Sequence, residues 1–411
     1  MRVLHTADWH LGDRLGRIDR THDLRRAVER VGAYCLQESV DVLLVAGDLF
    51  SEMARPDGLR ETIEHWQHVF REFLAGGGTI LTLTGNHDNE NFCRTLTHAM
   101  NLAAPTTAGM GDVVPAGRLY LATEPTLLRL RDRAESFEVQ FILMPYPTPS
   151  HYLRDEAGQK YSSPEEKNHK LMTAFLDTLR TIQRHERFDR ACPTVLSAHV
   201  HVRGAALGAS LFRLAEQDDV VIPPEGLPTQ FAYVALGHVH KPQAIAGRDH
   251  IRYSGSIERM DLGESADEKS VVVFDVGASG LKGRPRLLPL DATPIYEIDI
   301  RTPAVDLPIL RERYPDAAND LVNLHVTYTA GVDSLEELLR EAEEIFPRYY
   351  VRDWTESGAL GPALMPGEGS SQGKAFEETV REYVKCELMN HSDAEQAEIL
   401  GRLDTLLAEE S

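Results

Sequence analysis

The chain opens with Met1-Arg-Val-Leu-His-Thr-Ala-Asp8-Trp-His10-Leu-Gly12, in which a short apolar run comes directly before an Asp-x-His cluster. The run at 2–6 is rich in β-branched residues and leucine, which is typical of a short buried strand. The same arrangement of an apolar run that ends in a polar cluster recurs at 42–46, 79–84 and 194–198. The repeated pattern predicts strands that deliver polar side chains at their ends.

Helical patterns separate these runs at about 21–39 and 59–75, and Gly76-Gly77-Gly78 closes the second helix. Alternating strands and helices predict an α/β layered domain. Later apolar runs are typical of strands joined by turns, at 137–144, 232–236, 250–254 and 270–275. We therefore expect a two-sheet sandwich flanked by helices rather than one purely parallel sheet.

The composition excludes several classes of protein. With 411 residues, 42% hydrophobic and 26% charged, the chain has the composition of a folded globular protein with two or three domains. Its apolar stretches are too short for a membrane span, and no signal segment opens it, so we expect a cytoplasmic protein. The four cysteines are far apart and form no C-x-x-C motif, which predicts reduced packing residues: Cys35, Cys93, Cys192 and Cys386.

The charge balance sets a condition on any role with DNA. The 64 acidic and 43 basic residues give a formal net charge of −21. Such a charge argues against a nucleic-acid binder that works by electrostatic attraction alone. A DNA-directed function would need a local basic patch, bound metal or a basic partner.

Composition also predicts where the chain divides. The domain with the polar clusters is expected over 1–280, followed by a Gly/Pro-rich linker at 281–294 and a small βαβαβ unit at 295–355. Residues 356–374 have the composition of a flexible tether. Two amphipathic helices are expected within 375–411, the second opened by a capping box at Ser392 and Glu395. This helical hairpin either packs on its own domain or docks on a partner.

Five polar clusters follow the strand-like runs and carry the residue types that bind metals. They are Asp8-Trp9-His10, Gly47-Asp48, Gly85-Asn86-His87-Asp88, Ala198-His199-Val200-His201 and Gly237-His238-Val239-His240. Carboxylate, imidazole and amide oxygen together suit Mn²⁺, Fe²⁺ or Zn²⁺, and the lack of thiolates disfavours a structural zinc site. One Asp-x-His alone would be weak evidence, but five clusters each behind an apolar run predict a site at the carboxyl ends of the strands.

The number of ligands favours two metal ions. Asp8, His10 and His240 can bind one ion, Asn86, His199 and His238 can bind the other, and Asp48 can bridge them. Two ions at such a site stabilise the attacking and leaving oxygens of a phosphoryl displacement. The sequence therefore predicts hydrolysis of a phosphate ester.

His87 is the candidate for a catalytic role without metal ligation. It lies next to Asn86 and could stabilise developing charge or protonate the leaving oxygen, with Asp88 holding the ring. The alternative is a structural histidine beside the ligands. His5 and His201 also neighbour ligands, and packing or supporting roles are expected for both.

These motifs resemble the signature of the calcineurin-like metallophosphoesterase superfamily: Asp-x-His, Gly-Asp, Gly-Asn-His-Asp/Glu, a single His and Gly-His-x-His. The contexts Ala46-Gly-Asp-Leu-Phe, Leu83-Thr-Gly-Asn-His-Asp and Tyr253-Ser-Gly-Ser-Ile-Glu-Arg are similar to the bacterial SbcD family of nucleases, which are of the meiotic-recombination-eleven type. The resemblance covers about residues 1–275. The unit at 295–355 resembles the DNA-capping domain of that family by position and pattern only.

The resemblance implies a Mn²⁺-dependent nuclease that degrades double-stranded ends from the 3′ side and cuts single strands and hairpins internally. It also implies a homodimer at nucleoid DNA and an SMC-like ATPase partner, SbcC, which would bind the helices at 375–408. One position departs from part of the family, because Ser51 stands where archaeal and eukaryotic relatives have a histidine. This difference leaves the balance of exonuclease and endonuclease activity open.

Two further hypotheses stay open. A small-molecule phosphatase or cyclic-nucleotide phosphodiesterase would use the same ligands but has no need for a second domain and tethered helices. A non-catalytic scaffold would predict a damaged ligand set, whereas all the ligand residues are present. Four arginines flank the motif loops and are either phosphate contacts or ordinary solvated residues: Arg14, Arg17, Arg55 and Arg203.

Overall fold

The computed structural model describes residues 1–51, 55–105, 109–135, 137–154, 161–207, 219–315, 317–357 and 402. The chain divides into two compact units, Met1–Glu356 and Ser357–Ser411. The predicted tether beyond residue 357 and the helical hairpin at 375–411, Arg402 apart, lie outside the described residues. No helix in the described ranges is both long and apolar enough to cross a membrane.

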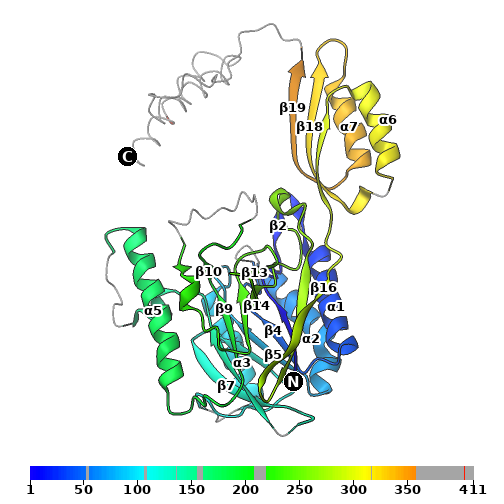
Figure 1. Ribbon diagram of the computed structural model, residues 1–411. Helices are drawn as coiled ribbons and strands as arrows, with labels where there is room; N and C mark the ends of the chain where they lie inside the picture. The colour runs from blue at the N-terminus through cyan, green and yellow to red at the C-terminus, as the bar shows by residue number, and fades with distance from the viewer. Residues whose placement is uncertain are drawn as a thin grey trace. The chain divides into compact units, whose positions relative to one another are not determined.

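Two six-stranded sheets form the centre of the first unit (Figure 1). The first has the order β16-β15-β1-β4-β5-β6, with bounds β1 (Arg2–Thr6), β4 (Val42–Val45), β5 (Thr79–Leu83), β6 (Leu119–Ala122), β15 (Ser270–Gly277) and β16 (Gly280–Pro289). The second has the order β13-β14-β12-β9-β8-β7, with β7 (Thr126–Arg131), β8 (Glu138–Met144), β9 (Thr194–His199), β12 (Tyr233–Gly237), β13 (Gln243–Ile245) and β14 (Arg248–Tyr253). Parallel strands make up the middle of each sheet, and antiparallel pairs lie toward the edges.

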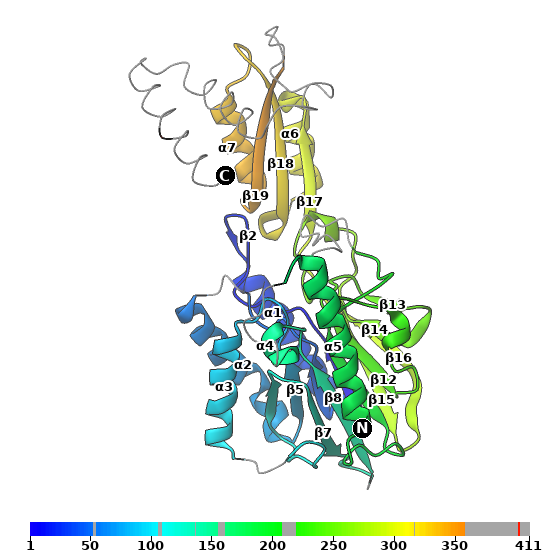
Figure 2. The same ribbon diagram turned by 90° about the vertical axis from the view of Figure 1, so that its left-hand side faces the viewer.

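Helices cover the outer faces of the two sheets (Figure 2). The first sheet packs against α1 (Thr21–Gln37), α2 (Pro56–Ala75) and α3 (Glu90–Ala103), and the second against α4 (Pro149–Tyr152) and α5 (Pro164–Arg184). The predicted two-sheet α/β sandwich flanked by helices is confirmed. The predicted strands and the two predicted helices recur with end shifts of a few residues.

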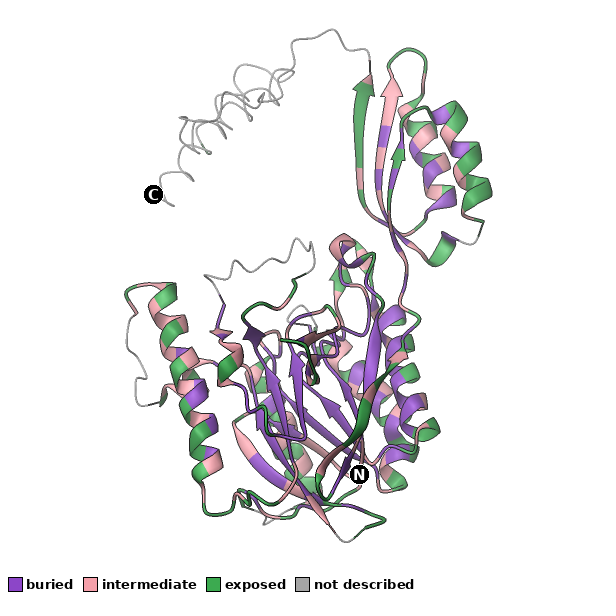
Figure 3. Cartoon of the chain, viewed as in Figure 1, coloured by how far each residue is buried: buried purple, intermediate pink, exposed green. Residues whose placement is uncertain are grey.

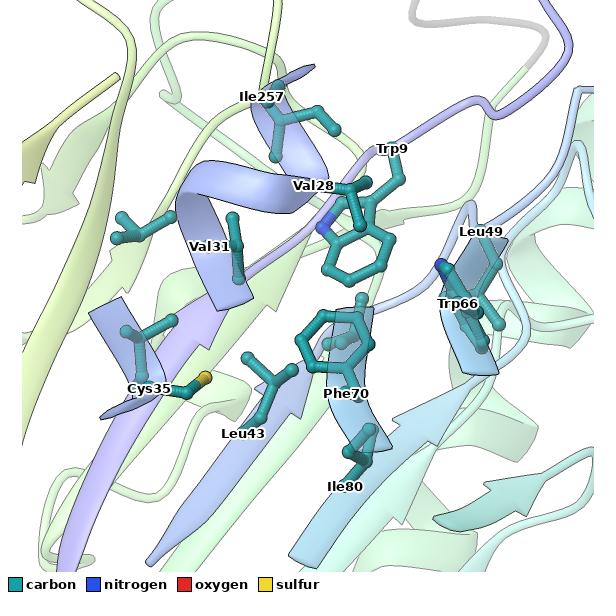
Figure 4. Packing of buried hydrophobic residues seen from close by; sticks show 14 of the residues in the cluster. Trp9, Val28, Val31, Cys35, Leu43, Leu49, Trp66, Phe70, Ile80 and Ile257 are labelled. Carbon is teal, nitrogen blue, oxygen red and sulfur yellow. The ribbon is translucent and has the colours of Figure 1, made fainter. Parts of the chain in front are cut away.

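The central strands of each sheet are buried on both faces, which explains their nearly continuous apolar runs, whereas the edge strand β16 is mostly exposed (Figure 3). Neighbouring residues in a strand point to opposite faces, so Leu44 packs between the sheets while Leu43 and Val45 pack under the helices. Trp9 extends the helix-side core beyond the end of β1, where its ring lies 5.3 Å from that of Trp66 (Figure 4). Its burial fixes the Asp-x-His loop against α2.

The predicted linker at 281–294 is wrong for most of its length. Residues 280–289 form β16, which pairs antiparallel with β15 through a tight turn at Ala278 and Ser279. β16 lies at the edge of its sheet. Pro285 has no backbone N–H to donate, and such a residue is tolerated on an edge strand, which pairs on one side only. Only residues 290–294 connect the sandwich to the small C-terminal fold.

The small fold has the predicted βαβαβ order, with β17 (Ile295–Ile300), α6 (Pro303–Arg313), β18 (Leu321–Thr329), α7 (Leu335–Ile345) and β19 (Tyr349–Ser357). β18 is the middle strand, and the helices pack on the sheet around a separate apolar core. The side chain of Ser334 accepts a hydrogen bond from the Glu337 amide, as the capping-box pattern predicts. β19 extends to Ser357 and therefore includes the first residues assigned to the tether.

An ion pair and a cation–π contact join the small fold to the sandwich. Arg348 binds Asp23 of α1 at 2.6 Å. Arg17 lies in the turn between β2 (Arg14–Leu15) and β3 (Ile18–Asp19), and its guanidinium is 3.5 Å from the centre of the Tyr349 ring. The other short elements are β10 (His201–Val202), β11 (Val221–Ile222), η3 (Pro224–Gly226), η4 (Leu262–Glu264) and η5 (Ala317–Asn319).

Candidate metal centre

The five polar clusters meet at the carboxyl edge of the two sheets. The first sheet contributes the residues after β1, β4 and β5, and the second contributes those at the ends of β9 and β12. Because these strands are parallel within each sheet, their carboxyl ends lie at one edge. The structure thus brings all seven predicted ligands together: Asp8, His10, Asp48, Asn86, His199, His238 and His240.

One group of ligand atoms comes from Asp8, His10 and His240. Their ligand atoms lie within 4.8 Å of one another, and the two histidine Nε2 atoms are 3.1 Å apart. Asp8 Oδ1 accepts a hydrogen bond from the His238 amide at 2.9 Å, whereas its buried Oδ2 has no hydrogen-bond partner among the described residues. A buried carboxylate oxygen left without a donor beside imidazoles fits a bound cation.

A second group surrounds Asn86. Its Oδ1 lies 2.9 Å from His238 Nδ1 and 3.0 Å from His199 Nε2. Asp48 stands between the two groups, because its Oδ2 is 3.2 Å from His199 Nε2 and 3.7 Å from His10 Nε2. Oxygen and imidazole donors at these positions could hold two borderline-hard divalent ions.

The outer nitrogen of each of three histidine rings has an oxygen partner. His199 Nδ1 donates to the Ala46 carbonyl at 2.7 Å, His238 Nε2 to Asp219 at 2.7 Å, and His240 Nδ1 to Glu264 at 2.8 Å. These hydrogen bonds fix the tautomers, so the nitrogen that remains on each ring is the one that faces the ligand group. The three rings are therefore oriented for metal binding by the protein itself.

Asp219 is a functional residue that the sequence did not reveal. It precedes β11, lies almost fully buried, and accepts hydrogen bonds from the Tyr146 hydroxyl at 3.0 Å and the Val220 amide. His201 Nδ1 lies 3.3 Å from the same carboxylate. Burial alone would raise the pKa of Asp219, but His201 and His238 hold it far below its usual value. As predicted, His201 supports the site from outside the ligand groups.

Glu264, in η4, was missed as well. Its Oε2 lies 2.6 Å from Nζ of the buried Lys269, which also donates to the His240 carbonyl at 2.9 Å. Burial opposes ionisation, yet His240 and Lys269 hold the pKa of Glu264 far below its usual value. Neither acidic residue stands in a recognisable motif, and the only available signal was that metal-binding histidines usually need such partners.

The backbone is strained at the ligands themselves. Asp8, His10, Asp48 and His238 have φ values of 53°, 44°, 50° and 99°, a region that residues other than glycine seldom adopt. Such conformations cost on the order of 1–3 kcal/mol each and concentrate at functional sites. Close packing adds a further constraint, because a Cβ on Gly85 would lie 2.0 Å from Asp48 Oδ1. The motif glycine is needed for Asp48 to reach its position.

The charges of the centre also suit a cation. Burial raises the free energy of a charged imidazole and lowers the pKa of His10 to about 3, so that its ring is the neutral form that binds metals. Burial alone would raise the pKa of Asp48, but His199 and His10 hold it well below its usual value. Burial opposes the charged form of His199 and His240 as well, yet Asp48 and Glu264 raise the pKa values of these two rings to about 9, so that positive charge balances the carboxylates where a cation would bind.

His87 and Asp88 differ in their relation to the centre. The His87 ring is half-buried at the rim, 5.1 Å from the His10 ring between centroids, and its amide donates to Asp48 Oδ1. Asp88 instead accepts hydrogen bonds from the backbone amides of Leu49, Phe50 and Gly85. Burial, followed by the Asp48 charge, raises the pKa of Asp88 to about 7. Asp88 thus holds two motif loops together, and its role in holding the His87 ring stays a prediction.

Several flanking residues have other partners. Arg17 packs on the Tyr349 ring of the small fold and donates to the Tyr349 carbonyl, and Arg14 donates to the Arg17 carbonyl. Arg55 and Arg203 are exposed. Ser51 is buried, and its hydroxyl donates to Asp13 at 3.0 Å.

Of the packing or supporting roles expected for His5, the structure shows packing, because its buried ring contacts the Tyr233 hydroxyl and burial lowers its pKa to about 3. The three cysteines within the described residues are free thiols, as expected: Cys35, Cys93 and Cys192.

Comparisons with known proteins agree with this site. Residues 1–242 match the family model described as calcineurin-like phosphoesterase. The chain is 30% identical over 299 residues to the SbcD component of the nuclease SbcCD from Rhodobacter capsulatus, which covers 71% of this chain and 69% of the relative. It is 28% identical over 284 residues to the Bacillus subtilis protein of that name, with 67% and 66% covered. A dimetal phosphatase from Danio rerio has a TM-score of 0.39 at 9% identity, with 71% and 99% covered.

Proposed function

This chain belongs to the calcineurin-like phosphoesterase family, with SbcD components of SbcCD nucleases among its relatives; it is a hydrolytic phosphodiesterase, and we propose that it is a Mn²⁺-dependent DNA nuclease. The proposed activities are 3′-to-5′ exonuclease action on duplex ends and endonuclease action on single strands and hairpins. The observation that carries the proposal is the convergence of seven ligand side chains around the buried, unpaired Asp8 Oδ2.

We assign Asp8, His10 and His240 to one metal ion, Asn86, His199 and His238 to the other, and Asp48 to both. When bound, two divalent ions neutralise charge on the phosphate and make water more acidic. The carboxylates of Asp219 and Glu264 orient the rings of His238 and His240 through the hydrogen bonds described above. The protein thus holds the ligand side chains in fixed, mostly buried positions for an in-line displacement at phosphorus.

We assign the proton transfer to His87. Its ring lies at the half-buried rim beside His10, where it can approach the substrate without being enclosed among the ligands. In this role an imidazole nitrogen donates a proton to the oxygen that leaves the phosphorus. Asp88 supports the geometry by holding the loops of Asp48 and His87, and we keep it as the residue proposed to orient the His87 ring.

We further propose that the chain works as a homodimer with an SbcC-type SMC-like ATPase in DNA end processing and double-strand break repair, at the nucleoid in the cytoplasm. The relatives are named as one component of a two-component SbcCD nuclease, which supports a partner protein. The helices expected at 375–408 are the proposed docking element. A partner that contributes DNA contacts would account for DNA binding by a chain with a net charge of −21.

The test is cleavage of an end-labelled duplex, a hairpin and a small chromogenic phosphodiester by the full chain in Mn²⁺. We expect cleavage of DNA that disappears with EDTA and with Asp8→Ala. If only the small ester is hydrolysed, the assay is repeated with the SbcC-type partner and ATP. Continued failure to cut DNA then would contradict the nuclease proposal and favour a small-molecule phosphodiesterase.

A further inference from the structure

A second cavity, of about 820 Å³, lies at the opposite edge of the second sheet. It is bordered by the last turn of α5, the residues that lead into β9 at Thr194, and the residues that lead into β12 at Tyr233. The ligand His199 is at the other end of β9, five residues along an extended strand, or roughly 16 Å away. The cavity is therefore separate from the candidate metal centre.

The charges that line this cavity contrast with the rest of the chain. Three arginines and one histidine line it, Arg180, Arg184, Arg190 and His250, and no aspartate or glutamate does so. Arg180 is paired with Asp177 at 2.6 Å. Arg184 and Arg190 are exposed, and neither side chain has an ion-pair or hydrogen-bond partner in the described part of the chain. Two arginines without an ion pair in the described part of the chain thus line the cavity, and the acidic group beside its wall is Asp189, whose carboxylate accepts a hydrogen bond from the Ala191 amide at 2.9 Å.

The two uncompensated arginines are not equivalent. Arg184 lies in the last turn of α5, where its charge partly offsets the negative end of the helix dipole. Arg190 lies in the loop that follows and has no such compensation. Guanidinium groups present several N–H donors in a plane and pair well with phosphate oxygens. This pair of side chains is suited to an exposed phosphate.

The remaining wall of the cavity is aromatic and polar. Phe188 is half-buried and its ring centroid lies 6.3 Å from that of the buried Phe231. Thr229 and Gln230 add polar groups, and the Thr229 carbonyl is 3.1 Å from His250 Nε2. The volume falls in the range of small-molecule sites, which combine an apolar wall with a few placed polar groups.

We propose that this cavity binds a phosphate-bearing ligand of nucleotide size, with Arg184 and Arg190 on the phosphate and Phe188 against the planar base. The phosphate belongs either to a free nucleotide or to a short stretch of nucleic acid, since both present the same chemistry. The proposal is independent of the nuclease assignment, because it concerns a site that does not include the metal ligands.

Calorimetric titration of the full chain with dAMP and with a five-nucleotide single strand tests the proposal. EDTA in the buffer removes metal from the candidate centre, and low salt limits screening of the arginines. We expect binding that is at least tenfold weaker in the double variant Arg184→Glu/Arg190→Glu. The matched control is Arg60→Glu/Arg94→Glu, which makes the same change in net charge at exposed positions of α2 and α3.

The two probes separate the sources of the phosphate. Binding of dAMP that the double variant loses supports a free-nucleotide site, whereas binding of the oligonucleotide alone with the same loss supports a nucleic-acid site. Failure of both probes to bind at millimolar concentration would overturn the proposal, as would equal weakening in the control. Both arginines are exposed, so the variants are expected to fold, with a small loss of stability from the negative charge that Arg184→Glu places at the end of α5. Arg190→Lys should retain part of the affinity.

Discussion

The carboxyl edge of the sandwich and the interior between its sheets are built from the same strands, but the interior buries apolar side chains and the edge buries charged ones. Leu44 lies fully buried in β4 among apolar side chains, and four residues later Asp48 lies equally buried as an ionised carboxylate with φ of 50°. In the interior, the burial of apolar side chains stabilises the fold, and the strands have the usual extended backbone. At the edge, the strained backbone, the buried charges and the Asp8 Oδ2, which has no hydrogen-bond partner among the described residues, each cost free energy. The interior therefore holds the edge in place.

This division predicts two separable kinds of damage. A change at the edge should remove chemistry while leaving the fold stable, because the sheets do not depend on the ligand groups. A change in the interior should lower stability while each folded molecule keeps its metal centre. Substitutions in both regions test whether the two properties separate in this way.

The largest effect is expected for Asp48→Asn. The carboxylate stands between the two ligand groups, so its loss should weaken both metal ions together and lower activity by about 10³-fold or more, equivalent to about 4 kcal/mol. Metal analysis after dialysis against Mn²⁺ measures the occupancy. The control Asp57→Asn removes an exposed carboxylate of α2 and should keep two ions. Loss of one ion only would contradict a bridging position.

His87→Ala should give the next largest effect, and on turnover alone. Removal of a proton donor typically costs about 10²–10⁴-fold in rate. Because the ring stands at the rim, Mn²⁺ binding should stay within about twofold of wild type. His98→Ala, on the exposed face of α3, serves as the control. A variant that loses Mn²⁺ with its activity would identify His87 as a ligand or as a structural residue.

Leu44→Ala tests the interior between the sheets. Truncation of a fully buried leucine typically costs about 2–5 kcal/mol of unfolding free energy. Urea unfolding measures that loss, and Leu36→Ala, at a position 43% exposed on α1, should change stability little. Metal content per folded molecule should be unchanged. A fall in Mn²⁺ affinity comparable with that of Asp48→Asn would show that interior and edge are not separable.

The sequence predicted the candidate ligands at the carboxyl edge better than the residues that hold those ligands in place. The seven candidate ligands could be predicted to lie together because each follows an apolar run, and parallel strands bring their carboxyl ends to one edge. Asp219 and Glu264 were missed because a carboxylate that contacts a ligand through space leaves no pattern along the chain. The linker at 281–294 was misplaced because glycine and proline suit an edge strand and its turn as well as a linker. The sequence also did not reveal that the buried oxygens of Asp88 accept hydrogen bonds from the amides of Leu49, Phe50 and Gly85.

The smallest effects on the metal centre itself are expected from Asp219→Asn and Glu264→Gln, which remove carboxylates that support its histidines. Loss of a carboxylate behind a metal-binding histidine typically weakens metal affinity by about 10–100-fold. Asp219 contacts His238 and Glu264 contacts His240, so each variant should weaken a different ion and leave the other near its wild-type affinity. Stepwise Mn²⁺ titration followed by electron paramagnetic resonance separates the two ions.

The two variants should also differ in stability, and this difference follows from their neighbours. Glu264→Gln leaves the buried Lys269 ammonium without its closest carboxylate, at 2.6 Å, and breaking such a pair costs about 3–5 kcal/mol. Asp219→Asn leaves two histidines, which can become neutral, and the uncharged Tyr146 hydroxyl and Val220 amide, so its cost in unfolding free energy should be smaller. Equal destabilisation by the two variants, or weakening of both ions by either one, would mean that the supports of the edge act as a single network rather than as two.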